Sequence, residues 1–173
     1  GQLLFTDKKN DSAKYVAPAP GTVAAINRGE RRVFQSLVID VEGHESKTFA
    51  AYKSEQLQEL DRQLVTDQLV ESGQWVAFRT RPFSKVPSAG SVASSIFVTA
   101  MDTNPLAADP TVIIGQREGD FANGLKVLSR LTDGPVNVCA APDVSIPGEE
   151  VEGVREINFS GPHPAGLAGT HIH

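Results

Sequence analysis

The chain has 173 residues, of which 40% are hydrophobic, and carries a formal net charge of -5. This length can bury one core or two small ones, and the acidic balance with scattered Lys and Arg argues against nucleic acid as a partner. No apolar run approaches the roughly 20 residues that cross a bilayer, and the first residues lack a secretory pattern. We therefore expect any membrane contact to be made through partner proteins.

Residues 1–50 predict a β segment. Short apolar runs at residues 2–5, 21–26 and 33–41 are separated by Gly, Pro, Asn and Asp at intervals typical of hairpins. We expect turns at residues 7–10 and 27–29.

Residues 54–73 predict an amphipathic helix with a break near Asp61. Ser54 suits its N-cap and Gly73 its end. Its apolar residues recur at three- and four-residue steps: Leu57, Leu60, Leu64, Val65 and Leu69. The following stretch, residues 82–95, is rich in Pro, Ser and Gly and indicates a surface connection.

The remaining residues predict a strand, a helix and further strands. Residues 95–101 and 136–140 are nearly continuous apolar runs, typical of parallel strands buried on both faces, and residues 154–159 offer one more strand. Between them, residues 120–132 place Phe121, Leu125, Leu128 and Leu131 on one helical face. The predicted fold class is therefore mixed α/β, with a βαβ unit within a domain at residues 54–173.

The side chains that could carry chemistry mostly have simpler structural interpretations. A lone Cys139 can form neither an intrachain disulfide nor an iron–sulfur or zinc site, which fits a cytoplasmic protein, and its apolar surroundings favour a buried thiol. After Met101 no glycine loop is present to cradle a phosphate. Asp102 and Asp109 could contact a metal or a ribose, but local caps are favoured.

The C-terminal segment holds His163, His171 and His173. In a strand, His171 and His173 would share a face, which would suit a metal site. No Cys or acidic residue lies within the segment to complete a ligand set, so a structural or partner-facing Gly/Pro loop is favoured.

The N-terminal segment resembles the hammerhead of biotinyl and lipoyl carrier domains. Its residues 1–9 and 16–23 contain a strand, a Lys-bearing turn, an Ala-Pro step and a Gly turn. In carrier proteins such a Lys bears the swinging cofactor, which makes Lys8 or Lys9 an attachment candidate. A solvated turn is the favoured alternative, because the surrounding turn has ordinary polar composition.

Several segments together resemble the A subunit of the sodium-translocating NADH:quinone oxidoreductase (Na+-NQR). The most specific stretches are residues 71–87 and 100–110; residues 4–10, 17–29 and 161–173 also contribute. The resemblance implies a middle fragment of a longer chain. It further implies a peripheral subunit on the cytoplasmic side of the bacterial inner membrane, in a complex that oxidises NADH, reduces ubiquinone and exports sodium ions.

This resemblance also implies a Rossmann-like domain similar to the flavoprotein subunit of complex I, without the nucleotide sites of that relative. Where that relative has glycines, residues 74–83 here carry bulky side chains that would keep a phosphate away. FMN, FAD and iron–sulfur centres are then expected in partner subunits, including membrane subunits, and no cofactor in this chain.

Quinone is the one ligand that the resemblance associates with this chain. Aromatic and cationic residues lie close together in one place, and they are the weak quinone-contact candidates: Trp75, Phe78, Arg79, Arg81 and Phe83. The favoured alternative is that Trp75 and Phe78 fill the space left by an absent flavin. No catalytic residue is predicted. The rival functions are a lipoyl or biotinyl carrier and a flavin-binding dehydrogenase fragment.

Overall fold

The structure, a computed structural model, describes residues 1–173 and divides into two compact units. The first unit holds residues 1–51 and 67–89, and the second holds residues 52–66 and 90–173. None of the helices has the length and apolar character needed to span a bilayer.

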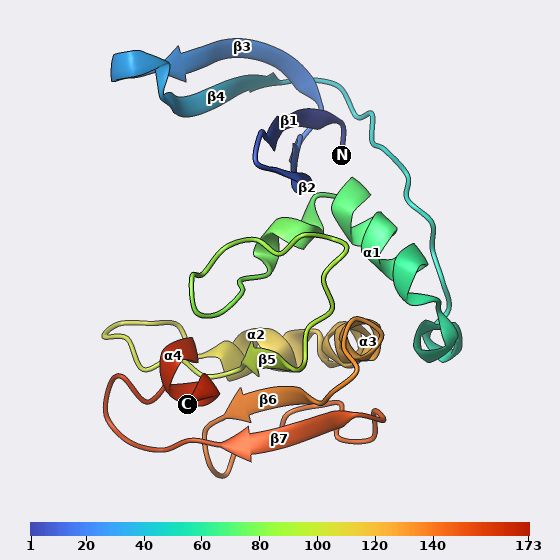
Figure 1. The fold of residues 1–173 in the computed structure, drawn as a ribbon, viewed down its shortest axis with the longest axis vertical. Coiled ribbons are helices and arrows are strands. Elements are labelled where there is room, and N and C mark those ends of the chain that lie inside the picture. The colour runs from blue at the N-terminus through green and yellow to red at the C-terminus, as the bar shows by residue number, and fades with distance from the viewer. The chain divides into compact units, whose positions relative to one another are not determined.

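Two antiparallel hairpins form the β part of the first unit (Figure 1). Strand β1 (Leu3–Asp7) pairs with β2 (Asn10–Val16), and β3 (Gly21–Arg28) pairs with β4 (Phe34–Val41). A short 3-10 helix, η1 (Glu30–Arg32), lies in the second turn. The three predicted strands are confirmed, whereas β2 was not predicted because its polar sequence shows little hydrophobic alternation.

The hairpins contact each other through aromatic rings but bury little. Phe5 stacks on Tyr15 at a centroid distance of 4.7 Å and contacts Phe34 at 4.9 Å. Ala13 is the one residue of this β part that is fully buried. The first unit must therefore obtain most of its core from elsewhere in the chain.

That core comes from the residues after α1 (Arg62–Glu71). Gly73 ends the helix with a left-handed φ of 75°, and a Cβ there would lie 2.8 Å from Val16 Cγ2. The 3-10 helix η3 (Gln74–Ala77) follows and contacts β2. Because of these contacts, residues 67–89 group with the N-terminal strands, so the two units divide the chain differently from the predicted domains at residues 1–50 and 54–173.

A three-stranded parallel sheet forms the second unit, in the order β5 (Ile96–Thr99), β6 (Val136–Ala140), β7 (Val154–Asn158). Helices α2 (Pro110–Gln116) and α3 (Glu118–Ser129) connect β5 to β6 and lie along one side of the strands in Figure 1. Every residue of β6 is buried, and Leu125 of α3 packs into the same core. The predicted parallel strands and mixed α/β class are confirmed.

The predicted helix at residues 54–73 occurs in two pieces, η2 (Ser54–Glu59) and α1, and the expected break falls at Leu60 and Asp61. Helix α2 was not predicted, since Val112 and Ile113 are exposed rather than part of a periodic buried face. The alternative of a strand carrying His171 and His173 is wrong, because this segment ends in a short helix, α4 (Ala168–Ile172).

Candidate functional site

The carboxyl edge of the parallel sheet is the place where open α/β folds bind ligands. Asp102 follows β5 there, and its Oδ1 accepts a hydrogen bond from the Asn104 N–H at 2.8 Å. Asp109 caps α2, where its Oδ1 accepts from the Thr111 N–H at 2.9 Å. The hydrogen bonds from Asn104 lower the pKa of Asp102, and those from the Thr111 hydroxyl and N–H lower the pKa of Asp109. Both predicted caps are confirmed.

The chain's own C-terminal segment covers part of this edge. The Gly166 N–H donates to Thr103 Oγ1 at 2.9 Å, and α4 contacts β5. A Cβ at residue 166 would lie 2.6 Å from the Thr103 backbone nitrogen, so only glycine allows this approach. The backbone after β5 is thus occupied by protein at the point where a nucleotide phosphate would need access.

His171 and His163 of this segment have different hydrogen-bond partners. His171 is only 4% exposed, its ring lies 4.4 Å from that of Phe159, and its Nε2 lies 2.9 Å from the Ala165 carbonyl oxygen. Burial lowers its pKa, which keeps the imidazole neutral and lets Nε2–H donate to Ala165 while Nδ1 has no partner. His163 approaches Thr103 Oγ1 at 3.4 Å instead. No group of three His, Cys, Asp or Glu side chains converges as a metal site would require.

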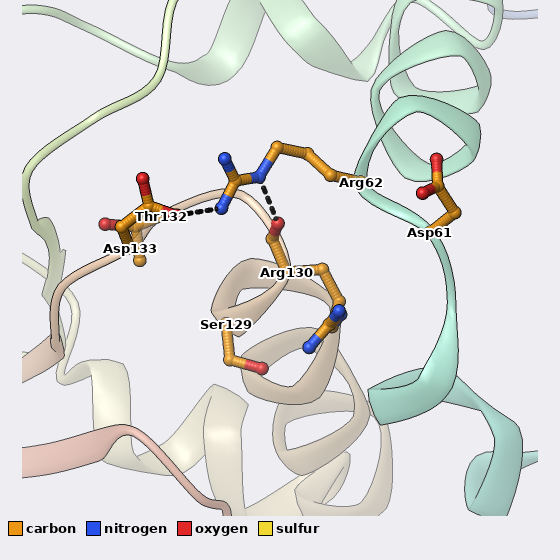
Figure 2. Close-up of a pocket in the computed structure, with 6 residues that line it drawn as sticks. All are labelled: Asp61, Arg62, Ser129, Arg130, Thr132 and Asp133. Atoms are coloured by element: carbon orange, nitrogen blue, oxygen red, sulfur yellow. Dashed lines mark hydrogen bonds and ion pairs between the residues drawn. The ribbon is translucent and has the colours of Figure 1, made fainter.

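A polar hollow of about 400 Å³ lies between the start of α1 and the end of α3 (Figure 2). Arg62 Nε donates to the Arg130 carbonyl oxygen at 2.9 Å, and its guanidinium pairs with Asp133 at 2.5 Å. In return, Arg130 Nε donates to the Leu60 carbonyl oxygen at 2.9 Å. Arg62 thus satisfies the carbonyl of the residue that caps the end of α3, and Arg130 satisfies the carbonyl of the residue that caps the end of η2. We call this pair of arginines the clasp and assign it a structural role.

The clasp was not predicted from the sequence. Arg62 and Arg130 are far apart along the chain, and neither lies in a motif. Helix ends do require partners for their carbonyl groups, but that rule does not say which distant side chain supplies them.

The quinone-contact candidates lie in the first unit and divide by exposure. Trp75 is 4% exposed, its indole N–H donates to the Pro87 carbonyl oxygen at 2.9 Å, and its ring meets Phe78 edge-on at 5.1 Å. Arg79 donates to the carbonyl oxygens of Val76 and Phe78. These three side chains are engaged with their own segment.

Arg81 and Phe83, the other two candidates, project from a closed loop. The Thr80 N–H donates to the Lys85 carbonyl oxygen at 2.8 Å, and the Ser84 N–H donates back to the Thr80 carbonyl oxygen at 2.8 Å. Phe83 is 76% exposed, and Lys85 Nζ lies 5.7 Å from its ring centroid. The five candidates therefore share a segment but differ in exposure, from the buried Trp75 to the exposed Phe83.

The remaining candidates, Lys8, Lys9 and Cys139, lie in ordinary structural positions. Lys8 and Lys9 are exposed in the β1–β2 turn, where the Lys9 N–H donates to Asp7 Oδ1 at 2.8 Å. Cys139 is fully buried in β6, as predicted, and burial raises the pKa of its thiol to about 11. A thiol with that pKa is protonated and inert at neutral pH.

Fold and sites together define a mixed α/β protein that joins small β hairpins to a parallel sheet without a phosphate loop. The family model described as the NqrA second alpha/beta domain matches residues 60–173, and that of the NqrA N-terminal barrel-sandwich hybrid domain matches residues 1–42. The chain belongs to the NqrA family.

Curated relatives agree with this assignment along the whole chain. The A subunit of the Na(+)-translocating NADH-quinone reductase from Saccharophagus degradans is 58% identical over 173 residues, and that from Marinomonas sp. is 60% identical over 173. The Haemophilus influenzae protein is 59% identical over 174 residues. Each alignment covers 100% of this chain but only 38 or 39% of the relative, so the chain spans about two fifths of their length.

Proposed function

We propose that this chain is part of the A subunit of a sodium-translocating NADH:quinone reductase. It acts with the other subunits, including membrane subunits, at the cytoplasmic side of the bacterial inner membrane. The complex couples NADH oxidation and ubiquinone reduction to sodium export. The observation that carries this proposal is the 58–60% identity to proteins of that name over the whole chain.

Within the complex, this part of the protein is a scaffold without its own flavin, and FMN, FAD and iron–sulfur centres belong to partner subunits. Its parallel α/β part is a Rossmann-like relative of the complex I flavoprotein subunit. Two observations support the scaffold role. Gln74 to Phe83 offers no glycine backbone for a phosphate, and the Gly166 segment covers the backbone after β5.

If the chain binds a ligand, we propose that residues 75–83 contact a quinone. Phe83 and Arg81 are exposed and could meet a quinone ring and its carbonyl oxygen, while the buried Trp75 and the half-buried Phe78 hold the segment in place. An aromatic wall with a nearby donor suits a quinone headgroup.

The test is a native mass spectrum of the chain, with and without a short-chain quinone, read beside its visible absorption. We expect an unmodified mass, no flavin absorption and a quinone adduct that Phe83→Ala weakens. Trp75→Phe, which keeps a ring in the core, is the matched control and should retain the adduct. An adduct that Phe83→Ala leaves unchanged would refute the quinone contact. A covalent increment or bound flavin would refute the scaffold role and favour the carrier or dehydrogenase alternative.

A further inference from the structure

The loop at residues 79–85 and the β1–β2 turn lie next to each other within the first unit. Asn10 Nδ2 donates to the Val86 carbonyl oxygen at 2.9 Å and to that of Pro87 at 3.2 Å. The Ala89 N–H also donates to Ser12 Oγ at 2.9 Å. The end of the turn is therefore attached directly to the end of the loop.

The turn and the loop that this junction joins carry four exposed cations and one exposed aromatic ring. We call them the basic loop face: Lys8, Lys9, Arg81, Phe83 and Lys85. None of the four cations forms an ion pair with a carboxylate. Two carboxylates, Asp7 and Asp11, lie in the same turn, so the face remains positive in a chain whose net charge is -5.

The face is also held in shape. The Asp7 side chain fixes the turn, and the Thr80–Lys85 backbone hydrogen bonds close the loop that carries Phe83. An exposed aromatic ring on a fixed loop bears a cost in water that contact with an apolar layer would relieve. The cations on either side of the ring would stay at the polar surface of that layer, where negatively charged groups would attract them.

We propose that the basic loop face binds the surface of a membrane that contains anionic phospholipids. Phe83 enters the interfacial layer, and Arg81, Lys85, Lys8 and Lys9 lie at the headgroup phosphates. A lipid surface fits these observations better than an acidic protein does. The four cationic groups form no ion pairs that fix their positions. They can therefore adjust to the many mobile phosphates of a lipid surface and need not match one fixed arrangement of carboxylates. This contact goes beyond the proposed function, because it requires neither quinone nor any partner protein, and it departs from the expectation that membrane contact is made through partners alone.

Vesicle co-sedimentation of the chain tests the proposal. Vesicles of phosphatidylcholine alone are compared with vesicles that also contain about one third phosphatidylglycerol, at low salt and at about 0.5 M salt. We expect binding only to the anionic vesicles, and loss of that binding at high salt because the charges are exposed and screened.

Three variants locate the contact. Phe83→Ala and the double variant Arg81→Glu/Lys85→Glu should each weaken binding by about tenfold or more. The control Lys53→Glu/Arg155→Glu makes the same change in net charge at two exposed positions of the second unit and should bind at least ten times better than the double variant.

Two results would overturn the proposal. One is a wild-type chain that stays in the supernatant with anionic vesicles at low salt. The other is equal weakening by the control variant, which would mean that binding follows net charge alone. If the wild type ignores vesicles but the Phe83 and Arg81/Lys85 variants impair assembly with the other reductase subunits, the face binds an acidic protein and the lipid proposal is wrong.

Discussion

Trp75 is expected to be the main anchor of the first unit, and its truncation should unfold that unit preferentially. Among residues 1–51 and 67–89, only Ala13 and Trp75 are buried apolar residues. Trp75→Ala removes the indole ring from its contact with Phe78 and takes away one of the two donors to the Pro87 carbonyl oxygen, leaving Asn10 Nδ2 at 3.2 Å.

The expected magnitude follows from these contacts. Replacing a buried Trp by Ala typically costs about 3–5 kcal/mol of unfolding free energy. Trp75→Phe keeps a ring in the core and loses the hydrogen bond to Pro87, so it should cost about 1–2 kcal/mol. Phe83→Ala removes an aromatic ring from the same segment but from an exposed position, and it should change stability by less than about 0.5 kcal/mol.

Urea unfolding followed by far-UV circular dichroism measures these differences, and amide hydrogen exchange locates them. Tryptophan fluorescence is unsuitable, because Trp75 is the only Trp in the chain. Exchange should accelerate first in β1 and β2, since β2 contacts η3, and should stay slow in β6. Equal costs for Trp75→Ala and Phe83→Ala, or uniform acceleration in β2 and β6, would refute the reasoning.

Three further predictions concern the second unit. Gly134→Ala would place a Cβ 1.9 Å from the Ser94 carbonyl oxygen and should lower the free energy of unfolding by about 1–3 kcal/mol. Gly124→Ala, in open space within α3, should raise it by about 0.5–1 kcal/mol. Thermal melting checks both substitutions. Burial raises the Cys139 thiol pKa from 9.0 to about 11, so the folded state keeps this proton at a pH where the unfolded chain has lost it. The free energy of unfolding should therefore fall between pH 9 and pH 11. Urea midpoints measure this fall, and Cys139→Ala should lack the part due to the thiol. Burial lowers the His171 pKa from its ordinary 6.5, so the neutral imidazole stabilises the C-terminal segment above that pH. Amide hydrogen exchange at residues 161–172, corrected for its intrinsic pH dependence, should therefore accelerate as the pH falls below 6.5. No acceleration, or the same acceleration in His171→Phe, would contradict this.

Local sequence patterns determined much of the secondary structure. The apolar runs of β5 and β6 predicted buried parallel strands because side chains that face helices or loops on both sides must be apolar. Asp109 predicted a local cap because a short carboxylate satisfies nearby backbone N–H groups without any distant partner; that this cap begins a helix was not predicted. The same kind of local information carried the resemblance to the NqrA family.

Local pattern was less informative where a role depends on a distant partner. Strand β2 is polar, and its place in the first unit follows from pairing with β1 and from contact with η3. The Arg62 and Arg130 clasp joins residues 68 positions apart, and nothing in the neighbouring sequence of either residue announces it.

For the candidate site, the sequence by itself determined which residue types occur together at positions 75–83, and only the tertiary structure decided what each one does. Trp75 is buried because β2 and Pro87 surround it, whereas Phe83, eight residues later, is exposed because the Thr80–Lys85 hydrogen bonds turn its loop outward. Burial and exposure depend on which distant segments pack against a side chain, and aromatic residues of similar character can therefore serve as a core anchor or as a contact surface.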